Sequence, residues 1–324
     1  MHDSAQWAPM TSLSSAIHRL RSGLVIPPVE LVFTSHPSWP CPKDRSLPTR
    51  LLEISVLDSS FNPPTAAHLG LLNARRPRYN SIDTSGRDYD AKLLLLSVRN
   101  ADKQLKSTDA TYTQRLEMMM KLAEEVTAQG KDEKEHSEHE NVAVAIIDEP
   151  TFVGKSSLLQ RFLRERTSSQ TEFRLTFLLG FDTLERFFAP RYYTNGPPSD
   201  DKEALSKMYS ALEGFFAPNR DGSRIVCARR SPSSYPQSIP PPNAEGSSSP
   251  DPAIPQSLAS VVHDFLTSRS LPTELVKMID IGEDVWAVSS SDVRNAILKG
   301  DSKWKTMVPS TVKSFVEAEN LYSS

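Results

Sequence analysis

The chain has 324 residues, of which 38% are hydrophobic and 24% are charged, a composition that favours a sizeable folded core over general disorder. A formal net charge of −3 argues against the basic surface that nucleic-acid binding needs, and no apolar run approaches the roughly 20 residues of a membrane span. Two cysteines, Cys41 and Cys227, are too few for a disulfide framework or a four-ligand zinc site, so we expect reduced thiols.

Residues 1–50 are expected to form an N-terminal extension, followed by a single domain over residues 51–324. The first dozen residues look frayed, and a short amphipathic helix over 14–22 and an extended segment over 29–34 follow them. This N-terminus lacks the continuous apolar core of a secretory signal and resembles a transit peptide only faintly. We therefore expect a cytoplasmic and/or nuclear protein.

Residues 51–72 predict a strand, a tight loop and a helix. The apolar run over 51–57 is rich in β-branched residues and breaks at Asp58, and the prolines that follow exclude a helix before Thr65. The free backbone N–H groups of a helix that begins there attract anions. Thr65 and His68 lie three positions apart and project from the same side of its first turn. A hydroxyl and an imidazole beside a positive helix end predict a phosphate-binding cradle.

The rest of the chain alternates between apolar strands and helices. The run over 91–98 is continuously apolar, which is typical of a strand buried on both faces of a parallel sheet. The other strands are expected over 142–147, 174–179, 222–228 and 276–281. Helices are expected over 112–128, 156–167, 184–188, 202–216 and 257–267. This alternation predicts an α/β fold, a doubly wound parallel sheet with right-handed crossovers.

Two segments are expected to interrupt this pattern. Residues 130–140 are highly charged and predict a solvated loop. Residues 231–256 are rich in serine and proline and almost free of apolar side chains, which predicts a disordered insertion. Because the strand and helix pattern resumes afterwards, the insertion does not divide the chain into two domains.

The loops that follow the strands are the expected ligand-binding positions, because ligands of doubly wound sheets bind beyond the carboxyl ends of the strands. These loops are residues 58–65, 99–106, 148–152, 180–182 and 229–230. Every residue that we select for chemistry lies in one of them, in the first turn of the helix that begins near Thr65, or at the start of the helix described next.

A second phosphate-binding element is predicted near the C-terminus, over residues 288–294, VSSSDVR. Three hydroxyls directly precede a helix with apolar periodicity, and Ser289 or Ser290 can serve as its N-cap. Arg294 falls one turn into that helix, on the face that the cap addresses. Alone, this pattern would indicate an ordinary capped surface helix.

Two motifs in this order carry a family resemblance. Residues 59–68, SSFNPPTAAH, resemble the G-[ST]-F-N-P-P-[HT]-x-x-H signature of the nucleotidylyltransferase superfamily, and the F-N-P-P core points to its nicotinamide mononucleotide adenylyltransferase branch. VSSSDVR resembles the I-S-S-T-x-x-R motif that grips the triphosphate of ATP in that family. The resemblance covers residues 51–324 and implies a Rossmann-like nucleotidylyltransferase fold. Ser59 replaces the signature glycine and the stacking tryptophan has no clear equivalent, which suggests a divergent, fungal-like branch.

The resemblance implies a nucleotidyltransferase that moves AMP from ATP to nicotinamide or nicotinate mononucleotide, giving NAD or its deamido form and pyrophosphate. His68, Thr65 and Arg294 would be its catalytic residues. The implied ATP-binding residues are Ser60, Phe61, Asn62, His68, Gly180, Asp182, Arg229, Ser289, Ser290, Ser291 and Arg294. Lys103 or Lys106 would take the mononucleotide phosphate, Phe152 is the candidate for stacking on the pyridine ring, and Asp182 would fix a ribose. Mg²⁺ would bridge the phosphates with water as its other ligands, so no protein metal ligand is assigned.

Two other functions stay open at this point. One is an ATP-binding regulatory or chaperone-like protein that has lost the transfer step, which Ser59 and the missing tryptophan favour. The other is a nucleotidylyltransferase for a different phosphorylated metabolite. The sequence does not distinguish nicotinamide from nicotinate mononucleotide, which differ by one amide.

Overall fold

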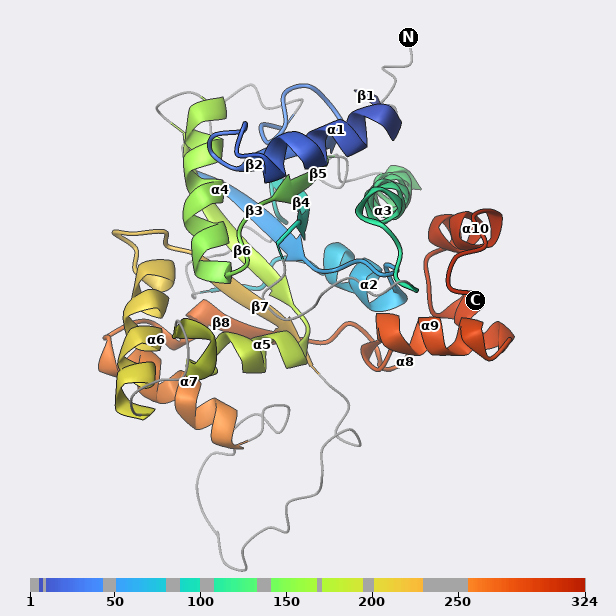
Figure 1. The fold of residues 1–324 in the computed structure, drawn as a ribbon. Coiled ribbons are helices and arrows are strands. Elements are labelled where there is room, and N and C mark those ends of the chain that lie inside the picture. Colours follow the sequence, from blue (N-terminus) through green and yellow to red (C-terminus); the bar gives the residue numbers. More distant parts are fainter. Residues whose placement is uncertain are drawn as a thin grey trace, which may run out of the picture.

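The structure, a computed structural model, describes residues 6–7, 10–42, 51–79, 88–99, 108–132, 141–167, 171–194, 201–229 and 256–323. Its strands are β1 (Gln6–Trp7), β2 (Val29–Thr34), β3 (Leu51–Asp58), β4 (Ala91–Ser97), β5 (Val142–Ile147), β6 (Glu172–Leu179), β7 (Arg224–Ala228) and β8 (Val276–Ile279). They form one sheet in the order β1-β2-β5-β4-β3-β6-β7-β8 (Figure 1).

The strands from β5 to β8 in this order are parallel, and the chain winds outwards in both directions from β3. Successive strands first add on the β4 side and then on the β6 side, so the winding direction reverses next to β3. This arrangement confirms the predicted doubly wound α/β fold. It also places the crevice for a ligand beyond the carboxyl ends of β3 and β6.

The segment before residue 50 contributes to the same sheet. Strand β2 pairs antiparallel with β5, with Val29 opposite Ile147 and Thr34 opposite Ala143, and β1 pairs antiparallel with β2. The N-terminal segment therefore covers the edge of β5, which would otherwise present unpaired backbone groups.

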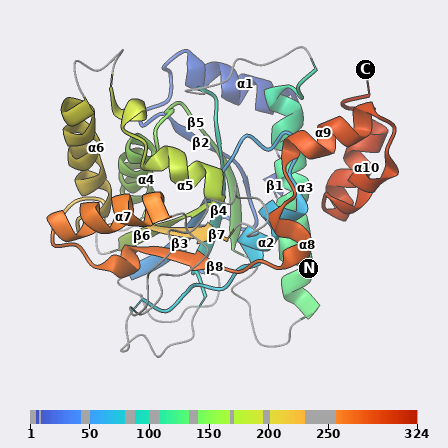
Figure 2. The ribbon, with the colours of Figure 1, turned by 90° about the horizontal axis from the view of Figure 1, so that it is seen from below.

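Helices cover both faces of the sheet (Figures 1 and 2). Helices α1 (Met10–Arg21), α2 (Ala66–Asn73) and α3 (Tyr112–Asp132) pack on one face, where Leu116 and Met119 of α3 are fully buried. Helices α4 (Phe152–Arg166), α5 (Phe181–Phe187), α6 (Asp201–Phe216) and α7 (Gln256–Ser268) pack on the other. Each face thus has its own apolar core.

The C-terminal part forms an outer layer against α3. It contains α8 (Glu283–Trp286), α9 (Ser290–Leu298), a short 3₁₀ helix at Ser302–Thr306 and α10 (Ser310–Ala318). Two further 3₁₀ helices, at Pro190–Tyr193 and Thr273–Leu275, lie earlier in the chain. A third apolar cluster joins Met118 of α3 to Val293, Trp304 and Val312. Figure 2 shows α9 and α10 beside α3, on the side away from the sheet.

Several predicted boundaries were wrong, and α5 is one case, since it begins at Phe181 instead of residue 184. Helix α1 begins at Met10 instead of residue 14, and α3 continues to Asp132, into the segment expected to be a charged loop. Helix α4 begins at Phe152 instead of residue 156, because the Thr151 hydroxyl caps it by accepting from the Gly154 N–H at 3.1 Å. Residues 133–140 and 231–255 lie outside the described residues. Across the described helices, none combines the length and the apolarity needed to cross a bilayer.

Candidate functional site

Two adjoining cavities lie beyond the carboxyl ends of the central strands. The first has a volume of about 260 Å³ and the second about 280 Å³. Asp58, Ser59 and Thr183 line both cavities, so these residues form the boundary between them. Asp58 is the last residue of β3 and Ser59 follows it, whereas Thr183 lies in the first turn of α5, after β6. The two cavities therefore meet at the point where the winding direction of the sheet reverses.

The first cavity brings together residues from both sequence motifs. Its lining includes Thr65 and His68 at the start of α2, and Ser289 at the start of α9. The expected loop residues Gly180, Asp182 and Arg229 also line it. Segments more than 200 residues apart in the sequence thus converge on one cavity, as the sequence predicted.

The start of α2 fixes the proton of His68. The backbone N–H of Thr65 donates to His68 Nδ1 at 2.9 Å, and the Thr65 hydroxyl lies at the same distance from that nitrogen. A backbone N–H can only donate, so Nδ1 is an acceptor and the ring proton resides on Nε2. Burial lowers the pKa of His68 to about 4, which keeps the ring neutral at pH 7. His68 is therefore a neutral N–H donor with a fixed orientation.

The Ser59 hydroxyl oxygen accepts the hydrogen bond from His68 Nε2–H. His68 Nε2 lies 2.9 Å from the Ser59 Oγ, at the boundary between the cavities. Thr65 itself is fully buried and its hydroxyl contacts the imidazole, so Thr65 orients His68 instead of presenting a free donor to a ligand. The serine at the signature glycine position thus holds the nitrogen that we expected to contact phosphate.

The second motif packs directly onto the first loop. The Ser289 Oγ accepts from the Asp292 N–H at 3.2 Å and caps α9, as predicted. Ser290 Oγ donates to the Pro63 carbonyl at 2.7 Å, and Arg294 Nη1 donates to the Asn62 carbonyl at 2.6 Å. The start of α9 therefore holds the loop that carries Ser59.

Several motif residues support this loop without lining either cavity, as far as the structure describes the chain. Phe61 is fully buried with a positive φ of 45°, and its ring lies 5.3 Å from that of His68. Asn62 is buried, and its Oδ1 accepts from the Ala110 N–H and the Tyr322 hydroxyl. Ser290, Ser291 and Arg294 also lie outside both linings. The residues of the two motifs that line neither cavity therefore have a structural role around the loop.

The two lysines expected to bind the mononucleotide phosphate, Lys103 and Lys106, lie outside the described residues.

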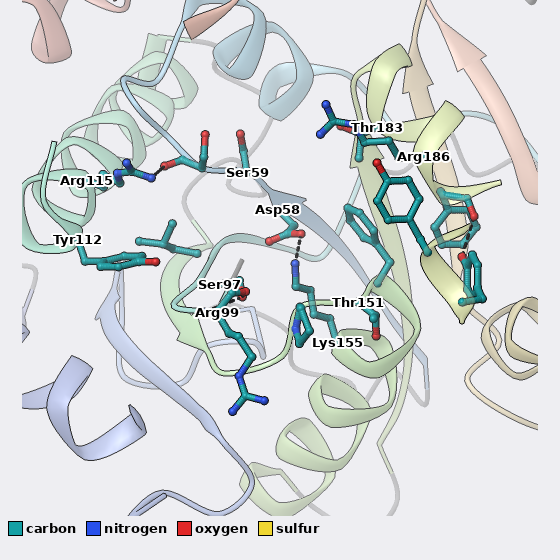
Figure 3. Close-up of a pocket in the computed structure, with 17 residues that line it drawn as sticks. Asp58, Ser59, Ser97, Arg99, Tyr112, Arg115, Thr151, Lys155, Thr183 and Arg186 are labelled. Atoms are coloured by element: carbon teal, nitrogen blue, oxygen red, sulfur yellow. Dashed lines mark hydrogen bonds and ion pairs between the residues drawn. The ribbon is translucent and has the colours of Figure 1, made fainter. Parts of the chain in front are cut away.

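The second cavity is rich in cations and aromatic rings. Arg99, Arg115, Lys155 and Arg186 line it, together with Tyr112, Phe152, Tyr192 and Tyr193. Figure 3 shows Asp58 and Lys155 facing each other near its centre, with Arg115 on one side and Arg186 on the other. Asp58 is the one acidic residue among the described residues of this lining. The cavity is therefore electropositive and suited to an anionic ligand.

Phe152 lines the second cavity but already has partners. Its ring packs edge-on against Phe177 and Phe187, with centroids 5.8 and 5.9 Å apart. Lys155 Nζ lies 5.0 Å from the centroid of the Phe152 ring. A pyridine ring would therefore share Phe152 with the ammonium group of Lys155.

Sequence reasoning missed Asp58, Arg99 and Lys155 as site residues. Asp58 and Arg99 follow strands, and their positions in the expected ligand loops were the available signal. Lys155 was hidden because the predicted start of α4 was four residues too late. In the sequence, Pro150 and Gly154 suggest a loop. In the structure, Gly154 lies within α4, and the absence of its side chain leaves space for Glu149, because a Cβ on residue 154 would lie 2.4 Å from the Glu149 side chain.

Carboxylates at the site are few. Asp58 and Asp182 line the first cavity, but no group of three or more His, Cys, Asp or Glu side chains in the described part of the chain is arranged to hold a metal ion. A Mg²⁺ ion here would thus take most of its ligands from phosphate and water, the arrangement that Mg²⁺ prefers.

No protein-family model matches this chain. A curated protein of Schizosaccharomyces pombe (strain 972 / ATCC 24843), named "Putative nicotinamide mononucleotide adenylyltransferase", is 29% identical over 272 residues, which cover 83% of this chain and 86% of that protein.

Two solved structures are more distant. Plasmodium falciparum nicotinic acid mononucleotide adenylyltransferase complexed with APC is 12% identical, covers 84% of this chain and 97% of its own, and has a TM-score of 0.44. Thermotoga maritima TmcAL bound with alpha-thio ATP is 11% identical, covers 83% and 56%, and has a TM-score of 0.37. With scores this low, neither structure bears on the activity of this chain. In its sequence the chain is therefore similar to a fungal protein named for the nicotinamide mononucleotide adenylyltransferase family, the family that its two motifs also resemble.

Proposed function

We propose that this protein is a nicotinamide-nucleotide adenylyltransferase, which transfers AMP from ATP to nicotinamide or nicotinate mononucleotide. The observation that carries the proposal is the pair of adjoining cavities with a common boundary at Asp58, Ser59 and Thr183. A transfer reaction needs two ligands whose reacting groups meet, and two cavities that join at one point supply that geometry.

ATP would occupy the first cavity. The starts of α2 and α9 both border this cavity, and the positive ends of the two helix dipoles suit a polyphosphate. Gly180 also lines this cavity, and a Cβ added there would meet no atom within 4 Å. The backbone at Gly180 therefore leaves open space in which a nucleotide can approach closely.

The mononucleotide would occupy the second, electropositive cavity. An oxygen of its 5′-phosphate would attack the α-phosphorus of ATP at the boundary, forming a new P–O bond while the bond from the α-phosphorus to the β-phosphate oxygen breaks. Pyrophosphate leaves with that electron pair. The attacking oxygen is already an anion, so the step needs no general base.

The protein would then act by positioning and charge stabilisation. The Nε2–H of His68 is a neutral donor beside the boundary, and a phosphate oxygen of ATP would displace Ser59 Oγ from it. Arg294 would act by holding the loop through the Asn62 carbonyl. Mg²⁺ would arrive with ATP and offset the charge of the phosphates.

The proposal is tested by incubating the purified protein with ATP, Mg²⁺ and a panel of mononucleotides. We expect release of pyrophosphate with nicotinamide or nicotinate mononucleotide, together with a dinucleotide product of the matching mass. Release with an unrelated phosphorylated metabolite, and with neither pyridine mononucleotide, would reject the pyridine substrate while retaining a nucleotidylyltransferase.

A second candidate is an ATP-binding regulatory protein that has lost transfer. The contact between His68 and Ser59 favours it, because a donor that already has an acceptor is less available to a phosphate. ATP binding by calorimetry without pyrophosphate release from any mononucleotide would identify this function.

A further inference from the structure

Lys155 lies in the second cavity, next to the boundary with the first. It projects into the second cavity from the first turn of α4 and forms an ion pair with Asp58, which lines both cavities. The two side chains are nearly buried, with 5% of Lys155 and 8% of Asp58 exposed. Burying a cation beside a cavity of this kind is costly unless its hydrogen-bonding capacity is used.

The ammonium group of Lys155 has more N–H donors than it uses within the described part of the chain. It carries three N–H groups, and within the described part of the chain Asp58 is its one hydrogen-bond acceptor. Its other neighbour in that part of the chain is the face of Phe152, at 5.0 Å, which offers no oxygen. Two N–H groups can therefore bind oxygens of a ligand in the second cavity.

Two of the neighbouring cations form hydrogen bonds with other groups. Arg99 donates through both Nε and Nη2 to the two carboxylate oxygens of Asp148, each at 3.0 Å. Arg115 donates to the Ala110 carbonyl at 2.9 Å and to the Ser60 carbonyl at 3.3 Å. Neither residue contacts Asp58, so Lys155 is better placed for a group that must reach the boundary.

We propose that Lys155, held in place by Asp58, binds the 5′-phosphate of the mononucleotide at the boundary between the two cavities. This inference rests on the proposed function, because it assigns the second ligand to the second cavity. An oxygen that attacks across the boundary must belong to a group at the boundary, and among the described residues Lys155 is the buried cation that pairs with the boundary residue Asp58. The pair also keeps the boundary close to neutral before the phosphate arrives.

Binding measurements on the full-length protein test this assignment. Nicotinamide mononucleotide, nicotinate mononucleotide and the corresponding ribosides would be titrated by calorimetry, with an ATP analogue that cannot release pyrophosphate present throughout. In Lys155→Met we expect mononucleotide binding to weaken by about 10- to 100-fold, the size expected for a charge-assisted hydrogen bond. Binding of the ribosides, which lack the phosphate, and of the ATP analogue should change by less than about twofold.

A double variant separates attraction by Lys155 from repulsion by Asp58. Lys155→Met alone leaves Asp58 unpaired, which would itself repel a phosphate. Asp58→Asn with Lys155→Met removes both charges, and we expect mononucleotide binding to stay weak. Recovery of wild-type affinity in the double variant would overturn the assignment, because Lys155 would then only neutralise Asp58.

Two further variants complete the design. Lys155→Arg should retain part of the preference for mononucleotide over riboside, since it keeps the charge. Lys207→Met, at an exposed lysine on α6 that pairs with Glu203, is the matched control and should bind like the wild type. Because binding is measured without turnover, loss of catalysis with intact Lys155-dependent binding would reject the proposed reaction and leave this assignment standing. Equal weakening of riboside and mononucleotide binding would instead overturn the assignment.

Discussion

The two cavities present different chemistry to a ligand. The first is built around helix starts, an open backbone position at Gly180 and the neutral imidazole of His68. The second is lined by cationic side chains, two of which pair with Asp148 and Asp58. The first cavity thus depends on backbone geometry and hydrogen-bond direction, whereas the second depends on charge. Substitutions should therefore act differently on the two sides.

The largest effect is expected at His68. Replacing His68 with Ala removes the donor at the boundary, and we expect the turnover number to fall by about 100-fold or more in a pyrophosphate-release assay. The variant also loses the acceptor for the Thr65 N–H, so its free energy of unfolding should fall by about 1 kcal/mol. His68→Gln, whose amide can donate from a similar position, should recover part of the rate. A rate unchanged in His68→Ala would show that the first cavity does not depend on this donor.

The neutral state of His68 predicts a pH dependence of stability. The pKa of His68 is about 4 in the folded protein, against about 6.5 in the unfolded chain, so between these values only the unfolded chain binds the proton. The contribution of His68 to stability is present above pH 6.5 and is lost as the pH falls towards 4. Between pH 7 and pH 5 the free energy of unfolding of the wild type should fall by about 2 kcal/mol more than that of His68→Gln.

Urea unfolding at the two pH values measures this difference, with His68→Gln as the reference for all other titrating groups. If the free energy of unfolding changed with pH in the same way in both proteins, burial would not keep His68 neutral. The description of the first cavity as one with a neutral donor would then be wrong.

A substitution at Gly180 tests whether ATP binding depends on the space beside the backbone of this residue. In Gly180→Ala the new methyl group points into free space, so stability should be unchanged while ATP binding weakens by about tenfold. Gly214→Ala, at a helical glycine that lines neither cavity and whose Cβ would also meet no atom within 4 Å, is the control. Calorimetric titration with ATP and thermal melting separate the two effects, and unaltered ATP affinity in Gly180→Ala would place the nucleotide elsewhere.

The smallest effect is expected at Ser59. Ser59→Gly frees the Nε2–H of His68 and removes a side chain from the boundary, so activity should be unchanged or up to about threefold higher. Ser59→Ala removes only the hydroxyl and separates the hydrogen bond from crowding. A collapse of activity in Ser59→Gly would show that the serine hydroxyl itself contacts the substrate.

The contrast between the cavities also explains what the sequence could predict. Strand β5 matches its predicted range because six consecutive apolar residues are buried on both faces, and the starts of α2 and α9 carry local capping signals. The first cavity was therefore accessible to local reasoning. The second is assembled from single residues on several elements, and Lys155 acquires its role only through Asp58, 97 residues earlier.

Local patterns also do not separate ligand contacts from structural contacts within one motif. Phe61 and Asn62 belong to the first motif, yet their side chains are buried under the loop residues and line neither cavity, while Ser59 and His68 line the first cavity. The partners that decide this, Arg294 and Tyr322, lie 232 and 260 residues further along the chain from Asn62. Only the folded chain brings these distant partners to the loop.

The bond from the Tyr322 hydroxyl to Asn62 has a consequence for biosynthesis. Asn62 is translated 260 residues before Tyr322. A nascent chain therefore holds this loop without the Tyr322 hydrogen bond until Tyr322 itself has emerged from the ribosome.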